Sequence, residues 1–479
     1  MPSAFEDFKV SLATPDVIAR LRDGVIGEGA EFDGPFGVQK LLYADYVASG
    51  RALRQVEGFV MERALPFYAN SHTEASFCGG MMTRMRREAR AIIAAECGAD
   101  DRFATVFAGA GATAGLNRLV HLLGVPEAVA RGAKPLVLLG PYEHHSNILP
   151  WRESGAEVVE IAEAAGGGPD MDALEATLIA ASGRRIIGAF SAASNVTGIM
   201  TDADAVTRML KRHGALAVWD YAGGGPYLAI DMRAGTDAEK DAVVVSPHKF
   251  VGGPGASGVM IVRKGAVCSG RMFQPGGGTV KFVSPTAHDF STDIATREEA
   301  GTPNVVGDLR AALVFLVKAA IGQAHMTARH ADLRARALQV WHGNPNIVLM
   351  GNMGAQALPI FSFRVRDAAR GGFLHHQLFT KLLSDAYGIQ ARGGCACAGP
   401  YAHRLLGIGT AESDAIRAAI LRGEEMEKPG WTRLNLSVLM DDAKADRVIA
   451  AVDALARNPY PMADAYCCDE ATARFRPAA

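Results

Sequence analysis

A lysine and an aspartate, each at the end of a short apolar run, could together perform cofactor chemistry. Lys249 follows the run at 242–246, and Asp220 closes an earlier run at 216–220. If the two runs are neighbouring parallel strands, both side chains project from one edge of a sheet. Pyridoxal phosphate needs a lysine that holds it as a Schiff base and an acid that keeps its pyridine nitrogen protonated. A surface lysine after a buried strand is the plainer alternative, but the glycine-rich stretch at 252–258 favours the cofactor.

A second group of residues could bind a phosphate. The glycine-rich segment 109–117 follows an apolar run at 104–107 and opens a helical pattern. Free backbone N–H groups and the positive end of a helix dipole suit an anion there. A tight strand-to-helix turn without any ligand explains the glycines as well. Ser246 and His248 strengthen the phosphate interpretation, because their side chains could reach the same anion as this turn.

Two adjacent histidines, His144 and His145, lie in the segment 141–151 after another apolar run. A histidine stacked on a cofactor ring can relay protons near neutral pH. Paired histidines in a loop are also common as plain surface residues or metal ligands. No cysteine or carboxylate at metal-ligand spacing lies nearby, so we expect no metal site.

The segment 391–400 places Cys395 and Cys397 on a glycine-rich loop close to Arg392. A thiolate on such a loop is mobile and accessible, as a nucleophile requires. The two cysteines can equally pack as small apolar side chains or bind a metal with help from elsewhere. If the loop is extended, we expect Cys395 to point elsewhere than Cys397. Cys395 could still serve as a resolving thiol.

Composition limits the kind of protein. The chain has 479 residues and 49% hydrophobic content, which suffices for a large core and more than one domain. The net charge of −2, with basic residues spread along the chain, leaves no electrostatic footprint for nucleic acid. No apolar run approaches the roughly 18 residues of a membrane helix, and the N-terminus lacks a signal-peptide pattern. Seven cysteines fit a reducing cytosol, so we expect a cytoplasmic protein without membrane or nucleic-acid partners.

The chemistry-bearing residues lie in a region where short β runs alternate with helical patterns, from residue 41 to about 307. This alternation predicts a mostly parallel sheet covered by helices on both faces, with ligands at the carboxyl ends of its strands. The other expected strands are at 135–139, 157–161, 185–190 and 259–262.

We expect two flanking parts beside this α/β domain at 41–307. Residues 1–40 are expected to be helical and to pack with a small C-terminal domain at 308–479. A long helical stretch is expected at 305–340. The small domain should be α+β, with strands at 360–365 and 432–436 and helices at 374–383 and 443–456.

On these motifs the chain resembles the class V aminotransferase family of fold-type I pyridoxal phosphate enzymes, and within it the group II cysteine desulfurases and selenocysteine lyases. The resemblance runs from about Leu42 to Leu455 and implies a mostly parallel sheet of the seven-stranded type. It also implies that His144 stacks on the cofactor ring. The cofactor-binding residues implied are Gly111, Ala112, Thr113, His144, Asn195, Asp220, Ser246, His248, Lys249 and Thr302.

The resemblance extends to the substrate and the nucleophile. Asn195 is expected on the substrate side of the cofactor, and Arg433 is expected to hold the substrate carboxylate, with Arg392 also at the substrate. Thr302 is expected to reach the phosphate of a neighbouring subunit, which implies a homodimer with shared active sites. The spacing Arg-x-Gly-x-x-Cys-Ala-x-Pro matches the family's persulfide cysteine to Cys397.

The resulting expectation is an enzyme with Lys249, Asp220, His144 and Cys397 as catalytic residues. It would convert cysteine to alanine with a persulfide on Cys397, and a sulfur-acceptor protein could take the sulfur onward. The alternatives are a class V aminotransferase, an epimerase or a C–S β-lyase without a cysteine nucleophile. A further alternative is a protein with this fold that binds a ligand without catalysis. The presence of Lys249, Asp220, His144 and Arg433 argues against it.

The chain also departs from the family pattern. Gly223 stands where the family has a glutamine bonded to the cofactor's phenolic oxygen. A stretch at 400–433, with a helical pattern at 412–422, is longer than in the desulfurases. The remaining departures are Ala112, Ala114, Cys395 and Ala396.

Overall fold

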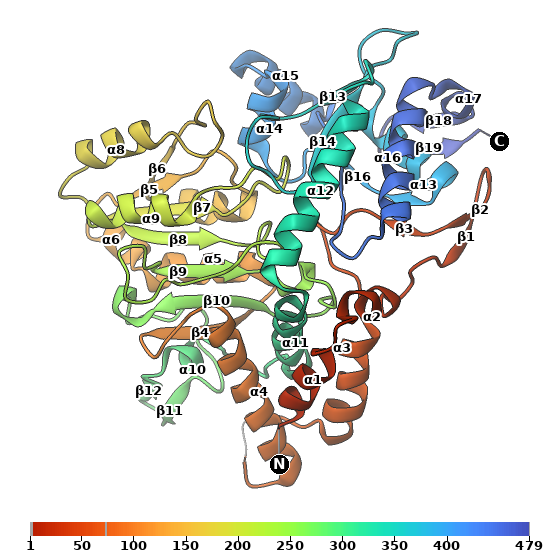
Figure 1. The fold of residues 1–479 in the computed structure, drawn as a ribbon. Coiled ribbons are helices and arrows are strands. Elements are labelled where there is room, and N and C mark those ends of the chain that lie inside the picture. The colour runs from red at the N-terminus through yellow and green to blue at the C-terminus, as the bar shows by residue number, and fades with distance from the viewer. Residues whose placement is uncertain (1–2, 72–73, 479) are drawn as a thin grey trace. The chain divides into compact units, whose positions relative to one another are not determined.

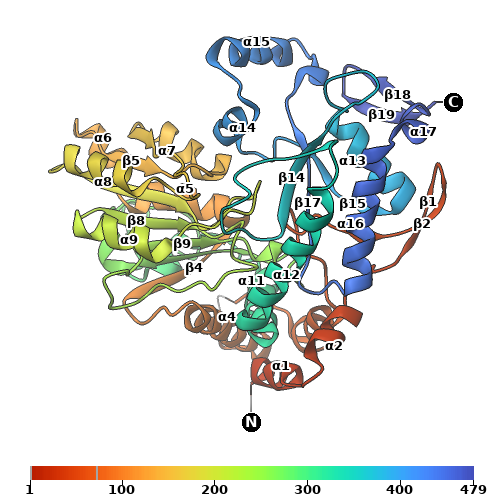
Figure 2. The ribbon, with the colours of Figure 1, turned by 45° about the horizontal axis from the view of Figure 1, so that its top comes forward.

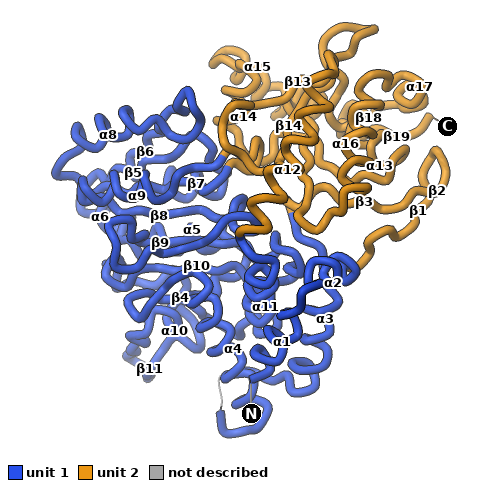
Figure 3. The backbone as a smooth tube through the Cα atoms, in the orientation of Figure 1, with its two compact units in different colours: residues 1–25, 49–193, 200–323 blue, residues 26–48, 194–199, 324–479 orange. Residues whose placement is uncertain are grey.

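The computed structural model describes residues 3–71 and 74–478, and they form two compact units. Figure 3 colours the two units separately. Unit 1 comprises Met1–Val25, Ser49–Ala193 and Met200–Gln323, and unit 2 comprises Ile26–Ala48, Ser194–Ile199 and Ala324–Ala479.

Unit 1 is built on a seven-stranded sheet in the order β4-β10-β9-β8-β7-β5-β6. The strands β9, β8, β7, β5 and β6 pair in parallel, whereas β10 is antiparallel to both of its neighbours. The predicted mostly parallel sheet is therefore confirmed. The strands are β4 (Phe103–Gly109), β5 (Leu136–Leu139), β6 (Glu157–Glu160), β7 (Ile186–Ser191), β8 (Leu216–Asp220), β9 (Ala242–Val245) and β10 (Gly258–Arg263).

Both faces of this sheet are buried, as its apolar strands require. Val137, Val218 and Val244 lie in a core cluster with residues of α5 (Gly111–Leu122) and α7 (Leu149–Glu153). The opposite face carries Trp219, whose Nε1–H donates to Thr207 Oγ1 of α9 (Ala203–Arg212) at 2.9 Å. Successive residues of each strand thus face opposite sides of the sheet. Helices cover the sheet on both sides in Figures 1 and 2. The short helices α6 (Val125–Ala130), α8 (Met171–Ala180) and α10 (Ile294–Glu298) also belong to this unit.

The N-terminal helices pack within unit 1, and of the segment 1–40 that was expected to pack with the small domain only residues 26–40 belong to unit 2. In α1 (Ala4–Leu12), Phe5 and Phe8 place their rings 5.1 and 5.6 Å from the ring of Phe59. This apolar contact explains the association. Residues 31–40 are not helical either, because they form an antiparallel hairpin in unit 2. The elements are α2 (Val17–Asp23), β1 (Glu31–Gly34), β2 (Gly37–Lys40), α3 (Arg54–Phe59) and α4 (Phe77–Glu96).

The long helical stretch expected at 305–340 is two helices, α11 (Val305–Ile321) and α12 (Gln323–Trp341). Gly322 separates them with a φ of 82°, a conformation that glycine adopts without strain. The helix α11 is largely buried in unit 1, so the small unit begins after this break rather than at residue 308.

Unit 2 contains a four-stranded antiparallel sheet in the order β13-β14-β17-β16. The strands are β13 (Ile347–Leu349), β14 (Ile360–Val365), β16 (Arg392–Gly394) and β17 (Trp431–Asn435). A parallel pair, β3 (Leu42–Tyr43) and β15 (Ile389–Gln390), brings the N-terminal segment into this unit. The other elements are α13 (His376–Tyr387), α14 (Gly399–Leu406), α15 (Thr410–Leu421), α16 (Asp442–Arg457), α17 (Tyr460–Ala463), β18 (Tyr466–Asp469) and β19 (Arg474–Pro477).

The predicted α+β character of unit 2 is confirmed, including the helical pattern at 412–422, which falls in α15. Among the described residues, no helix has the length and apolarity needed to cross a membrane.

Candidate active site

The parallel strands β8 and β9 end side by side, with Asp220 as the last residue of β8 and Lys249 four positions after the end of β9. These strands are parallel neighbours, so their carboxyl ends meet at one edge. Asp220 is buried, and Lys249 lies in the single 3-10 turn Pro247–Lys249 that follows β9. Burial raises the pKa of Asp220, while the charge of Lys249 acts in the opposite direction. The predicted pairing of an acid and a lysine at one sheet edge therefore exists in unit 1.

The start of α5 forms a cradle with the segment after β9. The backbone N–H of Ala112 donates to Ser246 Oγ at 2.9 Å. Gly111 has a φ of 60°, and a Cβ atom there would lie 3.1 Å from Ser246 Oγ and 3.6 Å from His248 Nε2. Gly111, Ser246 and His248 thus line one small space, at a helix N-terminus suited to an anion.

His248 contributes to this cradle as a neutral group. Burial, with a smaller effect from the charge of Lys249, lowers its pKa to about 4. At neutral pH the imidazole therefore offers one N–H donor and one acceptor nitrogen, not a positive charge.

The loop after β5 brings His144 and Thr113 together through Ser146. Thr113 Oγ1 lies 2.7 Å from Ser146 Oγ, and the backbone N–H of Ser146 donates to His144 Nδ1 at 3.1 Å. Because Nδ1 accepts this bond, the neutral ring of His144 carries its proton on Nε2. His145 instead lines an open cavity of about 540 Å³ with Thr113 and Ser146.

Glu143, the neighbour of His144, fastens this loop to β7. Its Oε1 accepts the backbone N–H of Ser191 at 2.8 Å, and its Oε2 accepts Ser191 Oγ–H and Asn147 Nδ2–H, each at 2.6 Å. Burial nevertheless raises the pKa of Glu143 to about 7, with Asp220 adding a smaller increase. Glu143 is a residue of this site that the sequence analysis missed as a functional group.

The turn carrying Lys249 is held by close backbone packing. The N–H of Gly50 donates to the carbonyl of His248 at 2.9 Å. A Cβ on Gly50 would lie 1.8 Å from the carbonyl oxygen of Phe250, and one on Gly253 would lie 2.0 Å from that of Pro247. Both positions therefore require glycine, and only Gly253 belongs to a stretch that the sequence analysis had noted.

In unit 2, Asp45 joins the two arginines that were expected at the substrate. Arg433 Nη2 lies 3.0 Å from Asp45 Oδ1, and Arg392 Nε lies 3.1 Å from Asp45 Oδ2. The arginines lie directly opposite each other on β17 and β16. Like charges in that arrangement repel each other, so Asp45 stabilises the pair. Asp45 was not predicted from the sequence.

The segment that carries Asp45 is fixed along β17 by Asn435. The N–H of Asn435 donates to the carbonyl of Ala44 at 2.8 Å, and its Oδ1 accepts the N–H of Val47 at 3.0 Å. The backbone around Asp45 is therefore fixed by two hydrogen bonds, one on each side of this residue.

Asn195 connects the arginine with the cysteine loop. Its backbone carbonyl accepts Arg433 Nη1–H at 3.0 Å, and its Nδ2–H donates to the carbonyl of Ala396 at 2.8 Å. Its Oδ1 is buried and has no hydrogen-bond partner in the part of the chain that the structure describes.

The cysteine loop is a reverse turn, which corrects the expectation based on an extended chain. Ala396 and Cys397 have φ values of 54° and 57°, and the N–H of Ala398 donates to the carbonyl of Cys395 at 3.3 Å. Cys397 is exposed, Cys395 is half-buried, and both are free thiols. The left-handed conformation costs about 1–2 kcal/mol for each residue with a side chain. The loop is not extended, so the expectation that Cys395 points away from Cys397 loses its premise, and residues two apart share one side of an extended chain in any case.

The residues predicted from the sequence are divided between the two units. In unit 1, Thr302 is exposed in the connection between α10 and α11, and Gly223 is buried in the turn after β8. Within the described chain, no three histidine, cysteine or acidic side chains are arranged to hold a metal ion. Unit 1 holds Gly111, Ala112, Thr113, His144, Asp220, Ser246, His248 and Lys249, and unit 2 holds Asn195, Arg392, Arg433, Cys395 and Cys397.

The sheet and its lysine–aspartate edge define the protein as an α/β enzyme of the pyridoxal phosphate-dependent class. The sequence profile of the family "Aminotransferase class-V" matches residues 42–427, so the chain belongs to this family. The expected cofactor class is therefore confirmed.

Curated relatives are similar over most of the chain. A probable cysteine desulfurase of Pyrococcus abyssi is 27% identical over 386 residues, covering 78% of this chain and 88% of the relative. A cysteine desulfurase of Klebsiella pneumoniae is 27% identical over 372 residues, covering 76% and 85%.

Solved structures share the fold. The cysteine desulfurase of Thermococcus onnurineus superposes with a TM-score of 0.72 at 22% identity, covering 87% of this chain and 95% of that one. The cysteine desulfurase CsdA of Escherichia coli gives a TM-score of 0.69 at 22% identity, covering 91% and 98%. The expected two-part architecture of fold-type I is thus confirmed.

Proposed function

We propose that the protein is a cysteine desulfurase, which converts cysteine to alanine and retains the sulfur as a persulfide on Cys397. One observation carries the proposal: Asn195 bonds both to Arg433 and to the turn that presents Cys397. A carboxylate-binding guanidinium and an exposed thiol are thereby linked through one residue of unit 2. The names of the relatives from Pyrococcus abyssi and Klebsiella pneumoniae support the same reaction.

The residues present fit pyridoxal phosphate. In the described structure Asp220 Oδ1 accepts the N–H of Ala222 at 2.7 Å, whereas Oδ2 receives no hydrogen bond and could accept one from a ring N–H. Gly111 lets the N-terminus of α5 approach Ser246 closely, because a Cβ atom there would lie 3.1 Å from Ser246 Oγ, and the groups gathered at this turn are of the type that binds a phosphate. When bound, the cofactor withdraws electrons from the substrate carbons next to its amine.

Each residue of unit 1 has a defined task in this proposal. Lys249 would hold the cofactor covalently, and Asp220 would keep the ring nitrogen protonated. Gly111, Ala112 and Thr113 would bind the phosphate through the first turn of α5, together with Ser246 and His248. His144 would stack on the ring and exchange a proton through Nε2, the nitrogen that its bond from Ser146 leaves protonated.

The residues of unit 2 would bind the substrate and accept its sulfur. Arg433, assisted by Arg392, would bind the carboxylate of cysteine, and Asn195 would face the cofactor with its buried Oδ1. The thiolate of Cys397 would attack the substrate sulfur. A sulfur–sulfur bond forms, the carbon–sulfur bond breaks, and the carbon gains a proton, so that alanine leaves and Cys397 holds the persulfide.

We further infer a homodimer with shared active sites. Unit 1 exposes an apolar surface formed by Met61, Leu65, Phe67, Tyr68 and Phe77, in which the rings of Phe67 and Phe77 lie 5.6 Å apart. Clustered exposed apolar residues of this kind mark interaction sites.

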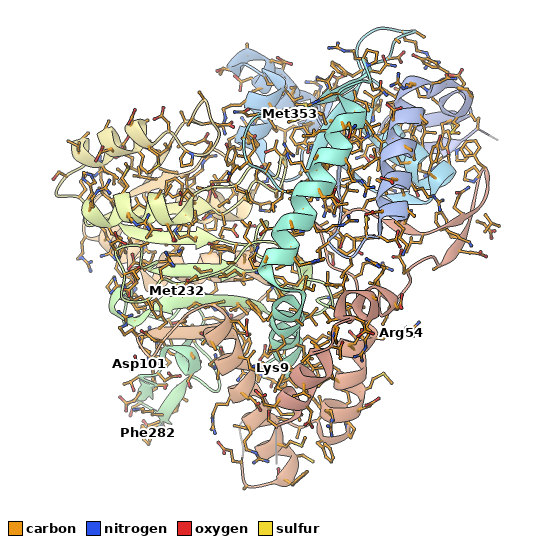
Figure 4. All side chains as sticks on the ribbon, viewed as in Figure 1. Lys9, Arg54, Asp101, Met232, Phe282 and Met353 are labelled. Carbon is orange, nitrogen blue, oxygen red and sulfur yellow. The ribbon has the colours of Figure 1, made fainter. Side chains whose placement is uncertain are left out.

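A second exposed apolar segment supports the dimer. Phe282, labelled in Figure 4, is 55% exposed on the hairpin of β11 (Val280–Val283) and β12 (His288–Phe290). Thr302, also exposed, could then reach the phosphate of the second subunit. Free cysteines fit a reducing cytoplasm, and a sulfur-acceptor protein would complete the cycle.

An anaerobic reaction with cysteine tests the proposed function. The protein loaded with pyridoxal phosphate should form alanine, and mass spectrometry should locate one additional sulfur on Cys397. Cys397→Ser should abolish alanine formation, whereas Cys467→Ser, which removes another exposed thiol of unit 2, should not. Formation of a keto acid by the wild-type protein, or undiminished alanine formation by Cys397→Ser, would contradict the proposal.

A further inference from the structure

The four residues Cys395–Ala398 form one hydrogen-bonded β-turn. The N–H of Ala398 donates to the carbonyl of Cys395 at 3.3 Å, which closes the turn. Both central residues, Ala396 and Cys397, have positive φ values of 54° and 57°. Positive φ at both central positions defines a type I′ turn. Cys395 is therefore the first residue of the turn, and Cys397 is the third.

Neither central residue is of the type that this turn favours. Type I′ turns strongly prefer asparagine or glycine, whereas alanine and cysteine carry a Cβ that opposes positive φ. The bond from Asn195 Nδ2 to the carbonyl of Ala396, 2.8 Å long, helps hold the peptide in this conformation. A conformation kept against local preference indicates that the placement of these side chains has a function.

The turn geometry places the Cα atoms of the two cysteines at a separation typical of disulfides. Two trans peptide units that fold back at a left-handed residue separate their outer Cα atoms by about 5.5 Å. Disulfides form at Cα separations of about 4.4–6.8 Å. An extended chain would place both thiols on the same side but would hold these Cα atoms about 6.6–7.2 Å apart, at or beyond the upper end of that range. The half-buried Cys395 and the exposed Cys397 are therefore positioned as a pair.

We propose that Cys395 is a second catalytic nucleophile, which discharges the persulfide of Cys397 as free sulfide and leaves a Cys395–Cys397 disulfide. This inference rests on the proposed desulfurase function. The thiolate of Cys395 attacks Cys397 Sγ, and a bond forms between the two Sγ atoms. The bond from Cys397 Sγ to the terminal sulfur breaks, and its electron pair leaves with that sulfur as hydrosulfide, while the proton of Cys395 passes to solvent.

The reaction needs no external oxidant. The terminal sulfur of the persulfide is reduced to sulfide while the two cysteines are oxidised to the disulfide. Hydrosulfide is a weaker base than an alkyl thiolate and is therefore the better leaving group. The enzyme then stays oxidised until a dithiol reductant cleaves the disulfide. Sulfide release coupled to a dithiol would thus operate when no sulfur-acceptor protein takes the persulfide directly.

A single turnover without reductant tests this step. The loaded enzyme is incubated without oxygen with one equivalent of cysteine per chain. We then measure alanine and sulfide, and we determine the mass of the loop peptide. Wild type should form alanine and release an equal amount of sulfide, and its loop peptide should be lighter by two hydrogens. Cys395→Ser should form the same alanine, release no sulfide and retain one additional sulfur on Cys397.

The control Cys467→Ser should behave as wild type, because this exposed thiol lies outside the turn. Wild type that keeps the persulfide and releases no sulfide would overturn the inference while leaving the proposed function intact. Absence of alanine in all proteins would instead overturn the proposed function, and this step with it. Failure of oxidised glutathione to form the Cys395–Cys397 disulfide in the cofactor-loaded enzyme would also overturn the inference, without any turnover.

Discussion

Asp45 and Arg433 form a buried ion pair in unit 2, with 3.0 Å between Oδ1 and Nη2. The same carboxylate also binds Arg392, so one negative charge serves two guanidinium groups. The three side chains together carry one net positive charge, which matches an amino acid with a single free carboxylate. A substrate carboxylate that binds Arg433 therefore competes with Asp45 for the same group.

Replacing Asp45 with asparagine should strengthen amino-acid binding and weaken the fold. Arg433 would lose its charged partner, so the KM for cysteine should fall by roughly tenfold, equivalent to about 1.4 kcal/mol. Two arginines would then face each other without a counterion, and the free energy of unfolding should fall by about 1–3 kcal/mol. Steady-state kinetics and urea unfolding measure the two effects. An unchanged KM would show that Asp45 does not compete with the substrate.

Replacing Arg433 with alanine should weaken amino-acid binding and leave the cofactor in place. Loss of a charged contact costs roughly 1.5–3 kcal/mol, or about a 10- to 150-fold higher KM. Cofactor occupancy, followed by visible absorbance, should stay near that of wild type, because the proposed cofactor contacts of unit 1 do not include Arg433. Arg433→Lys keeps the charge without the two-pronged geometry and should recover only part of the affinity. Loss of the cofactor in Arg433→Ala would contradict the assigned role.

Glu143 should make the stability of the protein depend on pH. Its pKa is raised to about 7 by burial, so between its ordinary value and 7 the folded protein binds more protons than the unfolded chain. The free energy of unfolding therefore falls as pH rises through this window. Above and below the window, the contribution of Glu143 to that free energy does not change with pH. Glu143→Gln should reduce this fall by roughly 3 kcal/mol.

The comparison uses unfolding curves of wild type and Glu143→Gln between pH 5 and pH 8. Only the slope is diagnostic, because the variant also changes the bonds to Ser191 and Asn147. Glu153→Gln, at the exposed last residue of α7, should keep the slope of wild type. Parallel curves for wild type and Glu143→Gln would show that Glu143 titrates normally.

The sheet of unit 1 could be predicted because its strands are buried on both faces and read as continuous apolar runs. The hairpin at 31–40 was not predicted, because its strands are short and mostly exposed and carry no apolar alternation. The break at Gly322 was missed for a different reason. A single glycine within a helical pattern is often tolerated, and only the positive φ shows that it ends a helix.

Within the site, residues that follow strands or belong to local motifs could be predicted, whereas long-range partners could not. Asp45 reaches Arg433 across 388 positions of sequence, so no local spacing reveals the pair. Glu143 was visible beside His144, but its role depends on Ser191 of another strand. The turn at Cys395 was hidden because alanine and cysteine rarely adopt positive φ.

Lys249→Ala should remove the visible absorbance of the bound cofactor, because no other residue is proposed to hold it covalently. The variant should fold, since Lys249 lies in a short turn whose backbone is fixed by Ser246 and Gly50. Absorbance spectra before and after dialysis, together with circular dichroism, provide the measurement. Retention of the band after dialysis would show that another lysine holds the cofactor.

Leu65→Glu should dissociate the proposed dimer. Leu65 is 50% exposed within the apolar surface of unit 1, and burial of a leucine side chain stabilises an interface by about 1.5–3 kcal/mol. A two-fold interface contains the residue twice, so a charge there should raise the dissociation constant by at least roughly a hundredfold. Sedimentation velocity should then show a shift from dimer to monomer. Leu421→Glu is the matched control, because Leu421 is 76% exposed on α15 in unit 2, outside this surface. A dimer that survives Leu65→Glu but dissociates with Leu421→Glu would move the interface to unit 2, and a wild-type monomer with full activity would rule out shared active sites.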